Sequence, residues 1–304
     1  MEIVLAELSR VKTPLLDMAY EHSGPDSGVP VILLHGFPYD IRGYDDAVAR
    51  INAAGFHTIV PYLRGYGPTR FLDDRTLRSG QQAALGQDLR ELMDALRIDK
   101  AVLAGYDWGG RAACVVSALW PERVHGLVSC TGYNIQDIPN SSRPADPVQE
   151  ARMWYVWYFH TERGRNGLTQ NRAALAKLLW KMWSPSWAFD DDAFNRTAPA
   201  FDNDDFVDVV IHSYMYRTGG VAGDERYAAI EAQLAAQPAI DVPTIVLHGA
   251  DDNITPVGNS ENHGRHFTSD YERRVLAGIG HNVPQEAPEE FAKAVIELCS
   301  RRVG

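Results

Sequence analysis

Residues 105–109, Gly-Tyr-Asp-Trp-Gly, lie between an apolar run at 100–104 and a run rich in small residues at 110–120. The first run is typical of a short buried strand and the second of a helix. Glycines at both ends of such a segment permit a tight, strained turn that lifts the central side chain clear of a sheet. The central residue here is Asp107. The pattern therefore predicts a nucleophilic carboxylate that attacks alkyl carbon.

The same Gly-x-Asp-x-Gly pattern occurs a second time, at residues 24–28. Its Pro, Ser and two Gly favour a surface turn, with no strand leading into it and no helix leaving it. Strand, turn and helix follow one another only around Asp107. We therefore expect Asp107 to be functional and Asp26 to be a turn residue.

Strand-like and helix-like segments alternate along most of the chain. Helices are expected at 42–53, 85–96 and 288–299, the second with leucines at helical spacing. Apolar or alternating runs typical of strands occur at 3–10, 14–22, 29–34, 57–62, 124–129, 244–248 and 271–277. This order predicts an α/β fold with a doubly wound, mostly parallel sheet, begun by an antiparallel pair.

Residues 134–235 interrupt this alternation. They contain no convincing strand and hold five of the seven tryptophans: Trp154, Trp157, Trp180, Trp183 and Trp187. Polar and glycine-rich stretches at 140–144 and 219–223 are typical of linkers. We expect a helical cap here, inserted into a core of residues 1–133 and 236–304. It would lie over the carboxyl ends of the strands, where ligands bind in open α/β sheets.

A nucleophilic Asp107 needs a base that activates water and an acid that orients the base. His281 is the candidate base, because residues 278–284 form a loop between the last strand and the last helix. Asp252 is the candidate orienting acid, just after the strand at 244–248, and it is favoured over Asp251 by its spacing from Gly249 and Pro256. Nucleophile, acid and histidine then follow in the order expected for this fold.

Backbone amides can stabilise the oxyanion that forms when water attacks the ester. The segment His-Gly-Phe-Pro at 35–38 follows the first buried strand, and we expect the amide of Phe37 to be one donor. The amide of Trp108, directly after the nucleophile, is the expected second donor. His35 itself is expected to have a structural, hydrogen-bonding role.

These segments together resemble the α/β-hydrolase superfamily, and more narrowly its epoxide hydrolases and haloalkane dehalogenases. The resemblance covers almost the whole chain and depends on the combination of motifs at 35–38, 64–67, 105–110, 249–252 and 280–281. It implies an epoxide hydrolase that forms a covalent ester on Asp107, hydrolysed by water that His281 activates. The implied product is a vicinal diol.

In epoxide hydrolases two cap tyrosines donate hydrogen bonds to the epoxide oxygen. Residues 154–159 and 211–217 resemble the two segments that carry them, which implies Tyr155 and Tyr214, with Tyr216 in reserve. Trp108, Trp157 and Tyr216 are the expected substrate contacts. A purely structural aromatic core of the cap is the alternative.

Dehalogenation by the same ester route is the main alternative. The indole of Trp108 suits a halide, although Phe37 stands where the usual second donor is an Asn, and a cap Trp could replace it. Fluoroacetate dehalogenases carry an Arg directly after the nucleophile, where this chain has Trp108. Only Arg111 matches their second arginine, so the haloacid reading is less favoured. A non-catalytic receptor on the same fold is a minor alternative.

Composition agrees with a soluble enzyme. The 304 residues include 29 Lys and Arg against 40 Asp and Glu, a net charge of −11, which disfavours nucleic acid or an anionic membrane as partner. Three widely spaced cysteines suit a reduced cytoplasm, and we expect a cytoplasmic protein. No metal or organic cofactor is expected. The expected partner is a small hydrophobic substrate, an epoxide or alternatively a haloalkane; monomer and homodimer are both open.

Overall fold

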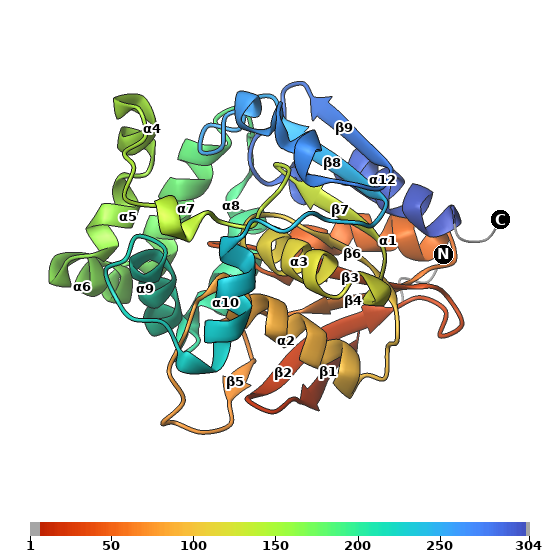
Figure 1. Cartoon of the computed structure of the whole chain (residues 1–304), viewed down its shortest axis with the longest axis horizontal. Coiled ribbons are helices and arrows are strands. Elements are labelled where there is room, and N and C mark those ends of the chain that lie inside the picture. The colour runs from red at the N-terminus through yellow and green to blue at the C-terminus, as the bar shows by residue number, and fades with distance from the viewer. Residues whose placement is uncertain (1–6, 302–304) are drawn as a thin grey trace.

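The computed structural model describes residues 7–301 and has a central sheet of nine strands in that part of the chain (Figure 1). Its order is β1-β2-β4-β3-β6-β7-β8-β9, with β5 paired to β2. The strands are β1 (Glu7–Lys12), β2 (Leu16–Ser23), β3 (Pro30–Leu34), β4 (His57–Pro61), β5 (Arg70–Phe71), β6 (Ala101–Gly105), β7 (Val124–Cys130), β8 (Thr244–Gly249) and β9 (Tyr271–Leu276).

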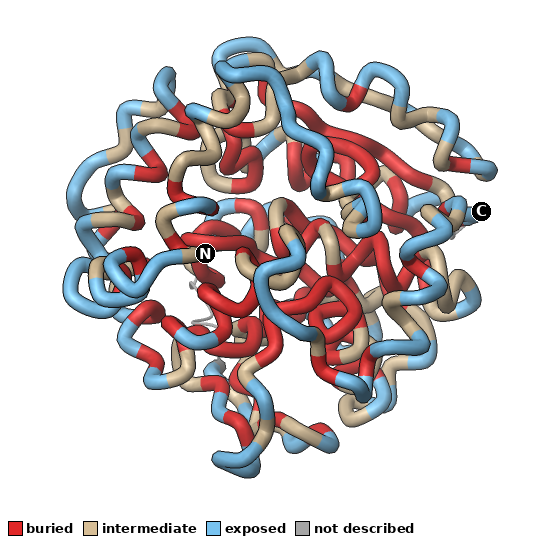
Figure 2. The backbone as a smooth tube through the Cα atoms, turned by 60° about the vertical axis from the view of Figure 1, so that its left-hand side comes forward, coloured by how far each residue is buried: buried red, intermediate tan, exposed pale blue. Residues whose placement is uncertain are grey.

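The sheet is parallel from β4 through β9 and antiparallel where β2 meets β1, β4 and β5. Helices cover both faces, so the central strands β6 and β8 are buried along their whole length. One face carries α1 (Asp45–Ala53) and α12 (Pro288–Ser300), and the other α2 (Gln82–Ala95) and α3 (Asp107–Leu119). Figure 2 shows this buried sheet as a continuous red interior under an exposed rim.

The predicted α/β fold with a mostly parallel sheet is confirmed. The predicted strand at 3–10 lies partly outside the described residues, and its described part belongs to β1. The expected helix at 42–53 starts as a short 3-10 turn, so α1 itself begins at Asp45. The two-residue β5 was not expected, because so short an edge strand leaves no periodic signal.

Residues 134–235, which we call the insert, contain helices and turns but no strand. Figure 1 shows most of the insert helices gathered beyond one end of the sheet, whereas α10 lies beside α2. The insert helices are α4 (Pro147–Arg152), α5 (Trp154–Phe159), α6 (Glu162–Gln170), α7 (Arg172–Trp183), α8 (Asp191–Thr197), α9 (Phe206–Tyr216) and α10 (Ala228–Ala235).

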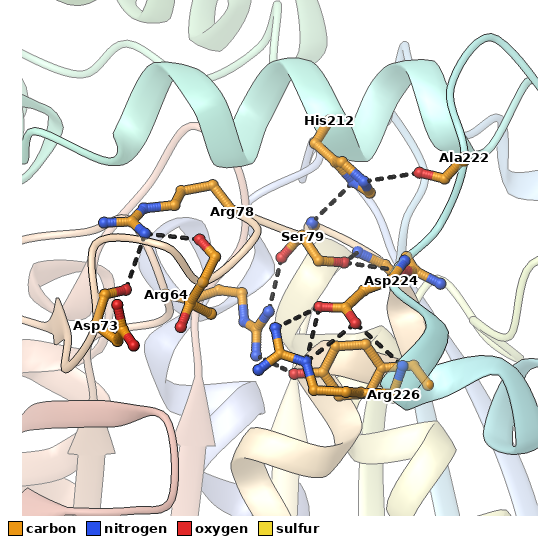
Figure 3. A network of polar contacts seen from close by, with 12 residues as sticks. Arg64, Asp73, Arg78, Ser79, His212, Ala222, Asp224 and Arg226 are labelled. Atoms are coloured by element: carbon orange, nitrogen blue, oxygen red, sulfur yellow. Dashed lines mark hydrogen bonds and ion pairs between the residues drawn. The ribbon is translucent and has the colours of Figure 1, made fainter.

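A polar network, buried around Arg64, joins the insert to α2 and to neighbouring loops of the core (Figure 3). Arg64 forms a bidentate ion pair with Asp88, at 2.6 Å for both hydrogen bonds, and also donates to the hydroxyl of Tyr227 at 3.0 Å. His212 of α9 accepts from the amide of Gly80 at 3.2 Å through Nδ1. The insert is therefore fastened to the core by charge-assisted and backbone hydrogen bonds as well as by apolar contact.

Among residues 7–301 no helix is long and apolar enough to cross a membrane. All three cysteines are buried and unbridged, as expected for small apolar side chains. Asp26 lies exposed in a turn, as expected, and no helix leaves that turn. The expectation that no strand leads into it was wrong, because β2 ends at Ser23, directly before the turn.

Candidate active site

Asp107 is the first residue of α3 and lies in the strained turn that leads from β6 into this helix. Its φ is +49°, a left-handed conformation that is costly for a residue with a side chain. Glycines make room for it: a Cβ on Gly36 would lie 2.5 Å from the Cβ of Asp107, and one on Gly109 only 1.9 Å from the carbonyl oxygen of Leu34. The strand-turn-helix arrangement predicted from residues 105–109 is thus present, with the carboxylate projecting from it.

The two carboxylate oxygens of Asp107 have different surroundings. Oδ1 accepts a hydrogen bond of 2.8 Å from the backbone amide of Phe37. Oδ2 faces Nε2 of His281 at 4.0 Å and Nη2 of Arg111 at 3.7 Å. The amide of Trp108 lies in the first turn of α3, where backbone donors have no partner within the helix. Oδ2 is therefore the oxygen left available for attack.

His281 is held by Asp252, although 29 residues separate them in the chain. Nδ1 of His281 donates to Oδ2 of Asp252 at 2.8 Å, and Oδ1 of Asp252 accepts from the amides of Ile254 and Thr255 at 2.9 and 2.8 Å. Because Nδ1 carries the proton, Nε2 is left as the acceptor that faces Asp107. Burial lowers the pKa of His281, but the charge and hydrogen bond of Asp252, with the charge of Asp107, raise it above its ordinary value.

The loop that carries His281 is clamped by Glu286 and Ser184. The carboxylate of Glu286 accepts from the amides of Gly280 and Asn282 at 2.6 and 2.9 Å. Ser184, just after α7 of the insert, donates to Glu286 at 2.6 Å and accepts from the amide of His281 at 2.9 Å. These four bonds position the backbone of His281 and connect it directly to the insert.

Tyr155 of α5 and Tyr214 of α9 lie together beside Phe37, whose backbone amide binds Asp107. They are 3% and 1% exposed, and their rings meet edge to face at 5.3 Å. Both pack on Phe37, at 6.5 and 5.3 Å between ring centroids, and Tyr214 also contacts Trp108. Burial raises the pKa of both phenols, so they remain protonated donors at neutral pH. The structure thus brings the two tyrosines together at the site.

Two expected substrate contacts lie elsewhere. Trp157 is 47% exposed, and its indole donates to Glu150 at 3.0 Å on the outer surface of the insert. Tyr155, two residues earlier, takes the inward position instead, because residues two apart lie on nearly opposite sides of a helix. Tyr216 is half-buried and stacks on His212 at 5.9 Å, two residues beyond Tyr214 and away from its face of α9. The structure therefore does not bring Trp157 and Tyr216 to the carboxylate of Asp107.

His35 has the structural role that was expected. Its Nδ1 lies 3.1 Å from the carbonyl oxygen of Gly36, and its Nε2 accepts from the amide of Leu63 at 3.1 Å. Burial lowers its pKa to about 4, so the ring stays neutral and secures the loop that carries Phe37.

Several residues at the site were not singled out from the sequence. The ring of Trp183 lies 5.3 Å from those of both His281 and Tyr155, and neither its indole nitrogen nor that of Trp108 has a hydrogen-bond partner among the described residues. Arg111 was named from the sequence only as a match to the second arginine of fluoroacetate dehalogenases, although a residue four positions after Asp107 lies on the same helix face. Ser184 and Glu286 carry no sequence signal for their joint role. No cluster of three or more metal-ligating side chains occurs within 7–301.

Residues 29–288 match the family model described as alpha/beta hydrolase fold. The chain belongs to this family, and it is an enzyme of the hydrolase class.

Within the family, the chain is similar to proteins described as epoxide hydrolases. A proposed epoxide hydrolase from Klebsiella pneumoniae, of known crystal structure, is 44% identical, with a TM-score of 0.94 and 97% of each chain covered. Epoxide hydrolase A of Mycobacterium tuberculosis is 23% identical over 90% of this chain and 92% of its own length. A haloalkane dehalogenase of Mycobacterium marinum is 30% identical over 42% of each chain.

Proposed function

We propose that this chain is an epoxide hydrolase that converts an epoxide to a vicinal diol through an ester on Asp107. The observation that carries the proposal is the pair of buried phenols, Tyr155 and Tyr214, packed on Phe37 beside the carboxylate. An epoxide oxygen needs hydrogen-bond donors as its ring opens, and two protonated phenols supply them. The epoxide hydrolases among the relatives support the same reaction.

In the first half-reaction Oδ2 of Asp107 attacks an epoxide carbon. The bond between that carbon and the epoxide oxygen breaks, and the oxygen takes a proton from Tyr155 or Tyr214. The product is a hydroxyalkyl ester of Asp107. The amide of Phe37 holds Oδ1, which leaves Oδ2 to react.

In the second half-reaction Nε2 of His281 removes a proton from water, and the water oxygen attacks the carboxyl carbon of Asp107. The resulting oxyanion is stabilised by the amides of Phe37 and Trp108. The ester bond breaks, and the leaving alkoxide takes the proton from His281. The second water proton replaces the one given by the tyrosine, so one epoxide and one water yield one diol.

The insert would act as a cap over this site. It supplies both tyrosines, Trp183 and the hydroxyl of Ser184 that bonds to the amide of His281. Covering Asp107 with these side chains limits access of water to the attack step, which strengthens the electrostatic interactions inside.

Dehalogenation is a second candidate that rests on a different observation. The buried indole N–H groups of Trp108 and Trp183 have no acceptor within 7–301, and a halide leaving group would be one. The same Asp107 ester and His281-activated water would complete the reaction. Two phenols at the expected cap positions favour the epoxide reaction over this one.

A trapping experiment distinguishes the candidates. Replacing His281→Gln removes the base for ester hydrolysis, so the ester should accumulate. The protein mass should then rise by the mass of the whole epoxide, or, for a haloalkane, by the mass of the reagent less the hydrogen halide that leaves. Intact-mass measurement and peptide mapping after incubation with styrene oxide should locate the adduct on Asp107. An adduct from 1-bromobutane alone, with halide release by the unmodified enzyme, would support dehalogenation. No adduct from a broad panel of epoxides and haloalkanes would reject the nucleophile assignment.

A further inference from the structure

Arg217 lies over the ring of Tyr214, one of the two phenols at the site. Its guanidinium carbon is 4.5 Å from the centre of that ring. We propose that Arg217 is a positioning residue whose positive charge stabilises the phenolate left when Tyr214 or Tyr155 gives its proton to the epoxide oxygen. This inference rests on the proposed epoxide hydrolase function and adds a residue to its first half-reaction.

The end of α9 directs Arg217 onto Tyr214. The helix ends at Tyr216, but Arg217 keeps helical backbone angles, with φ −64° and ψ −14°. Side chains three residues apart in a helix are neighbours, so those of Tyr214 and Arg217 meet. The hydroxyl of Thr218 donates to the carbonyl oxygens of Tyr214 and Met215 at 3.1 and 3.0 Å. Capping these carbonyls therefore does not require the guanidinium.

The charge of Arg217 has no carboxylate partner within 7–301, where its side chain forms no ion pair or hydrogen bond. Asp137 and Glu150 line the same surface cavity of about 360 Å³ as Arg217. Both carboxylates bind elsewhere: Asp137 accepts from Asn140 at 3.0 and 2.8 Å, and Glu150 accepts from the indole of Trp157 at 3.0 Å. The guanidinium is thus free to interact with negative charge that arises at the site.

The same cavity places Arg217 between the helices that carry the two phenols. Val156 of α5 lines it together with Arg217. Tyr155 directly precedes Val156, and its ring meets that of Tyr214 at 5.3 Å. The guanidinium therefore lies at the junction of α5 and α9.

The surroundings of the two phenols act on their acidity in opposite directions. Burial raises the pKa of Tyr155 and of Tyr214, and the negative charge of Asp107 also raises both. Among the interactions that lower these pKa values, the charge of Arg217 is the largest for each phenol, and Arg111 adds a second positive charge. Arg217 therefore makes proton donation easier, and its guanidinium stays charged throughout.

The negative charge that Arg217 would stabilise is created in the attack step. Oδ2 of Asp107 loses its charge when it bonds to the epoxide carbon. The bond between that carbon and the epoxide oxygen breaks, the oxygen takes the phenol proton, and the electron pair of the phenol O–H bond stays on the tyrosine. Negative charge thus moves from Asp107 to a phenol beside Arg217. An interaction that strengthens from ground state to transition state raises the rate of that step.

The test separates charge from size at position 217. Lys and Met have side chains of similar length, so Arg217→Lys and Arg217→Met differ mainly in charge. Stopped-flow fluorescence with styrene oxide measures how fast the ester forms on Asp107. We expect Arg217→Met to slow this step about 10-fold, equivalent to about 1.4 kcal/mol, and Arg217→Lys to retain most of the rate. Ester hydrolysis, in which His281 takes a proton from water, should change little.

Arg90→Met is the matched control. It removes a guanidinium that lies 4.9 Å from the ring of Trp120, on α2 and outside the site. The rate of ester formation should be the same in this variant as in the unmodified enzyme.

A second comparison tests whether Arg217 acts through the hydroxyl groups. Tyr155→Phe and Tyr214→Phe keep the rings, and with them the packing of Arg217, but each removes one proton donor. The loss of rate caused by Arg217→Met should be smaller in at least one of these backgrounds than in the unmodified enzyme.

Equal rates of ester formation in Arg217→Lys and Arg217→Met would overturn the proposal. A loss from Arg217→Met that is the same in both phenylalanine backgrounds as in the unmodified enzyme would overturn it as well. If Arg217→Met does not fold, judged by circular dichroism, Arg217→Gln takes its place as the neutral variant. No ester on Asp107 from any epoxide, even in His281→Gln, would instead reject the epoxide hydrolase function itself, so the two failures remain distinct.

Discussion

Nδ1 of His281 lies 2.8 Å from Oδ2 of Asp252, while Nε2 of the same ring lies 4.0 Å from Oδ2 of Asp107. The first distance is that of a hydrogen bond, whereas the second is too long for one and leaves space between His281 and Asp107. This asymmetry fixes the tautomer of His281 and directs its acceptor nitrogen toward Asp107, on which we propose that the ester forms.

Replacing Asp252→Asn should remove this control. An amide nitrogen opposite Nδ1 would favour the tautomer in which Nε2 carries the proton, so His281 could no longer accept one from water. We expect ester hydrolysis to slow about 10²- to 10⁴-fold in single-turnover experiments, with alkylation of Asp107 affected less. The neighbouring exposed Asp251→Asn should retain normal rates. Equal losses of hydrolysis rate in Asp252→Asn and Asp251→Asn would contradict the assignment of Asp252 as the acid that orients His281.

The two half-reactions should differ in their pH dependence. Ester hydrolysis needs neutral His281, so its rate should fall as the pH drops through the pKa of that ring. The charge of Asp107 helps to raise this pKa in the resting enzyme. Esterification removes that charge, so the pKa in the intermediate should be lower. NMR titration gives the pKa of His281 in the free enzyme, and the pH profile of ester hydrolysis gives its pKa in the intermediate. A higher pKa from the profile than from the titration would refute this prediction.

The same pKa shift affects stability with a defined sign. Because the folded-state pKa of His281 lies above its unfolded value, protonation favours the folded state. This stabilisation is complete below an unfolded pKa of about 6.5 and disappears as the pH rises through the folded value.

The tyrosine pair should act on alkylation alone. Tyr155→Phe and Tyr214→Phe each remove one donor to the epoxide oxygen, and losing one such donor costs about 10²- to 10³-fold in rate. Stopped-flow fluorescence of the buried tryptophans can follow ester formation directly. Tyr158→Phe, in the same helix α5, is the matched control and should alkylate normally. If the three variants behaved alike, the phenols would have only a packing role.

The clamp on the His281 loop should be visible in catalysis as well as in stability. Glu286→Gln replaces a carboxylate that accepts two backbone amides, and Ser184→Ala removes the link to the insert. Losing such buried bonds costs about 1–3 kcal/mol each. We expect a lower melting temperature and a reduced rate of ester hydrolysis, with KM little changed. Glu289→Gln, at an exposed position of α12, should alter neither quantity.

Asp40 offers a test of pH-dependent stability outside the catalytic residues. Burial raises its pKa to about 7, although Thr197 and the amide of Arg42 donate to it at 2.7 and 3.0 Å. The folded state therefore holds a proton that the unfolded chain releases near pH 4, and stability falls between about pH 4 and 7. Asp40→Asn should gain about 2–4 kcal/mol at pH 8 and nothing at pH 3.5. Denaturant unfolding at both values measures this, and an equal gain at each would contradict it.

The sequence predicted the sheet well, because the patterns that indicate strands and helices are local. Apolar runs of strand length and the leucine spacing of α2 depend on neighbouring residues only. Glycines around Asp107 likewise mark a turn that no bulkier residue could form. The weakest predictions, Trp157 and Tyr216, were those that required knowing which way a side chain on a short helix faces.

Asp107 was identifiable from five consecutive residues, since a strained turn between a strand and a helix requires small neighbours that the sequence displays. The surroundings of its carboxylate were decided by the tertiary structure. Phe37, 70 residues away, binds one oxygen, and Arg111 and His281 face the other. Phe37 and His281 reach Asp107 only through the packing of the sheet and its loops, whereas Arg111 lies near Asp107 because of the spacing within α3.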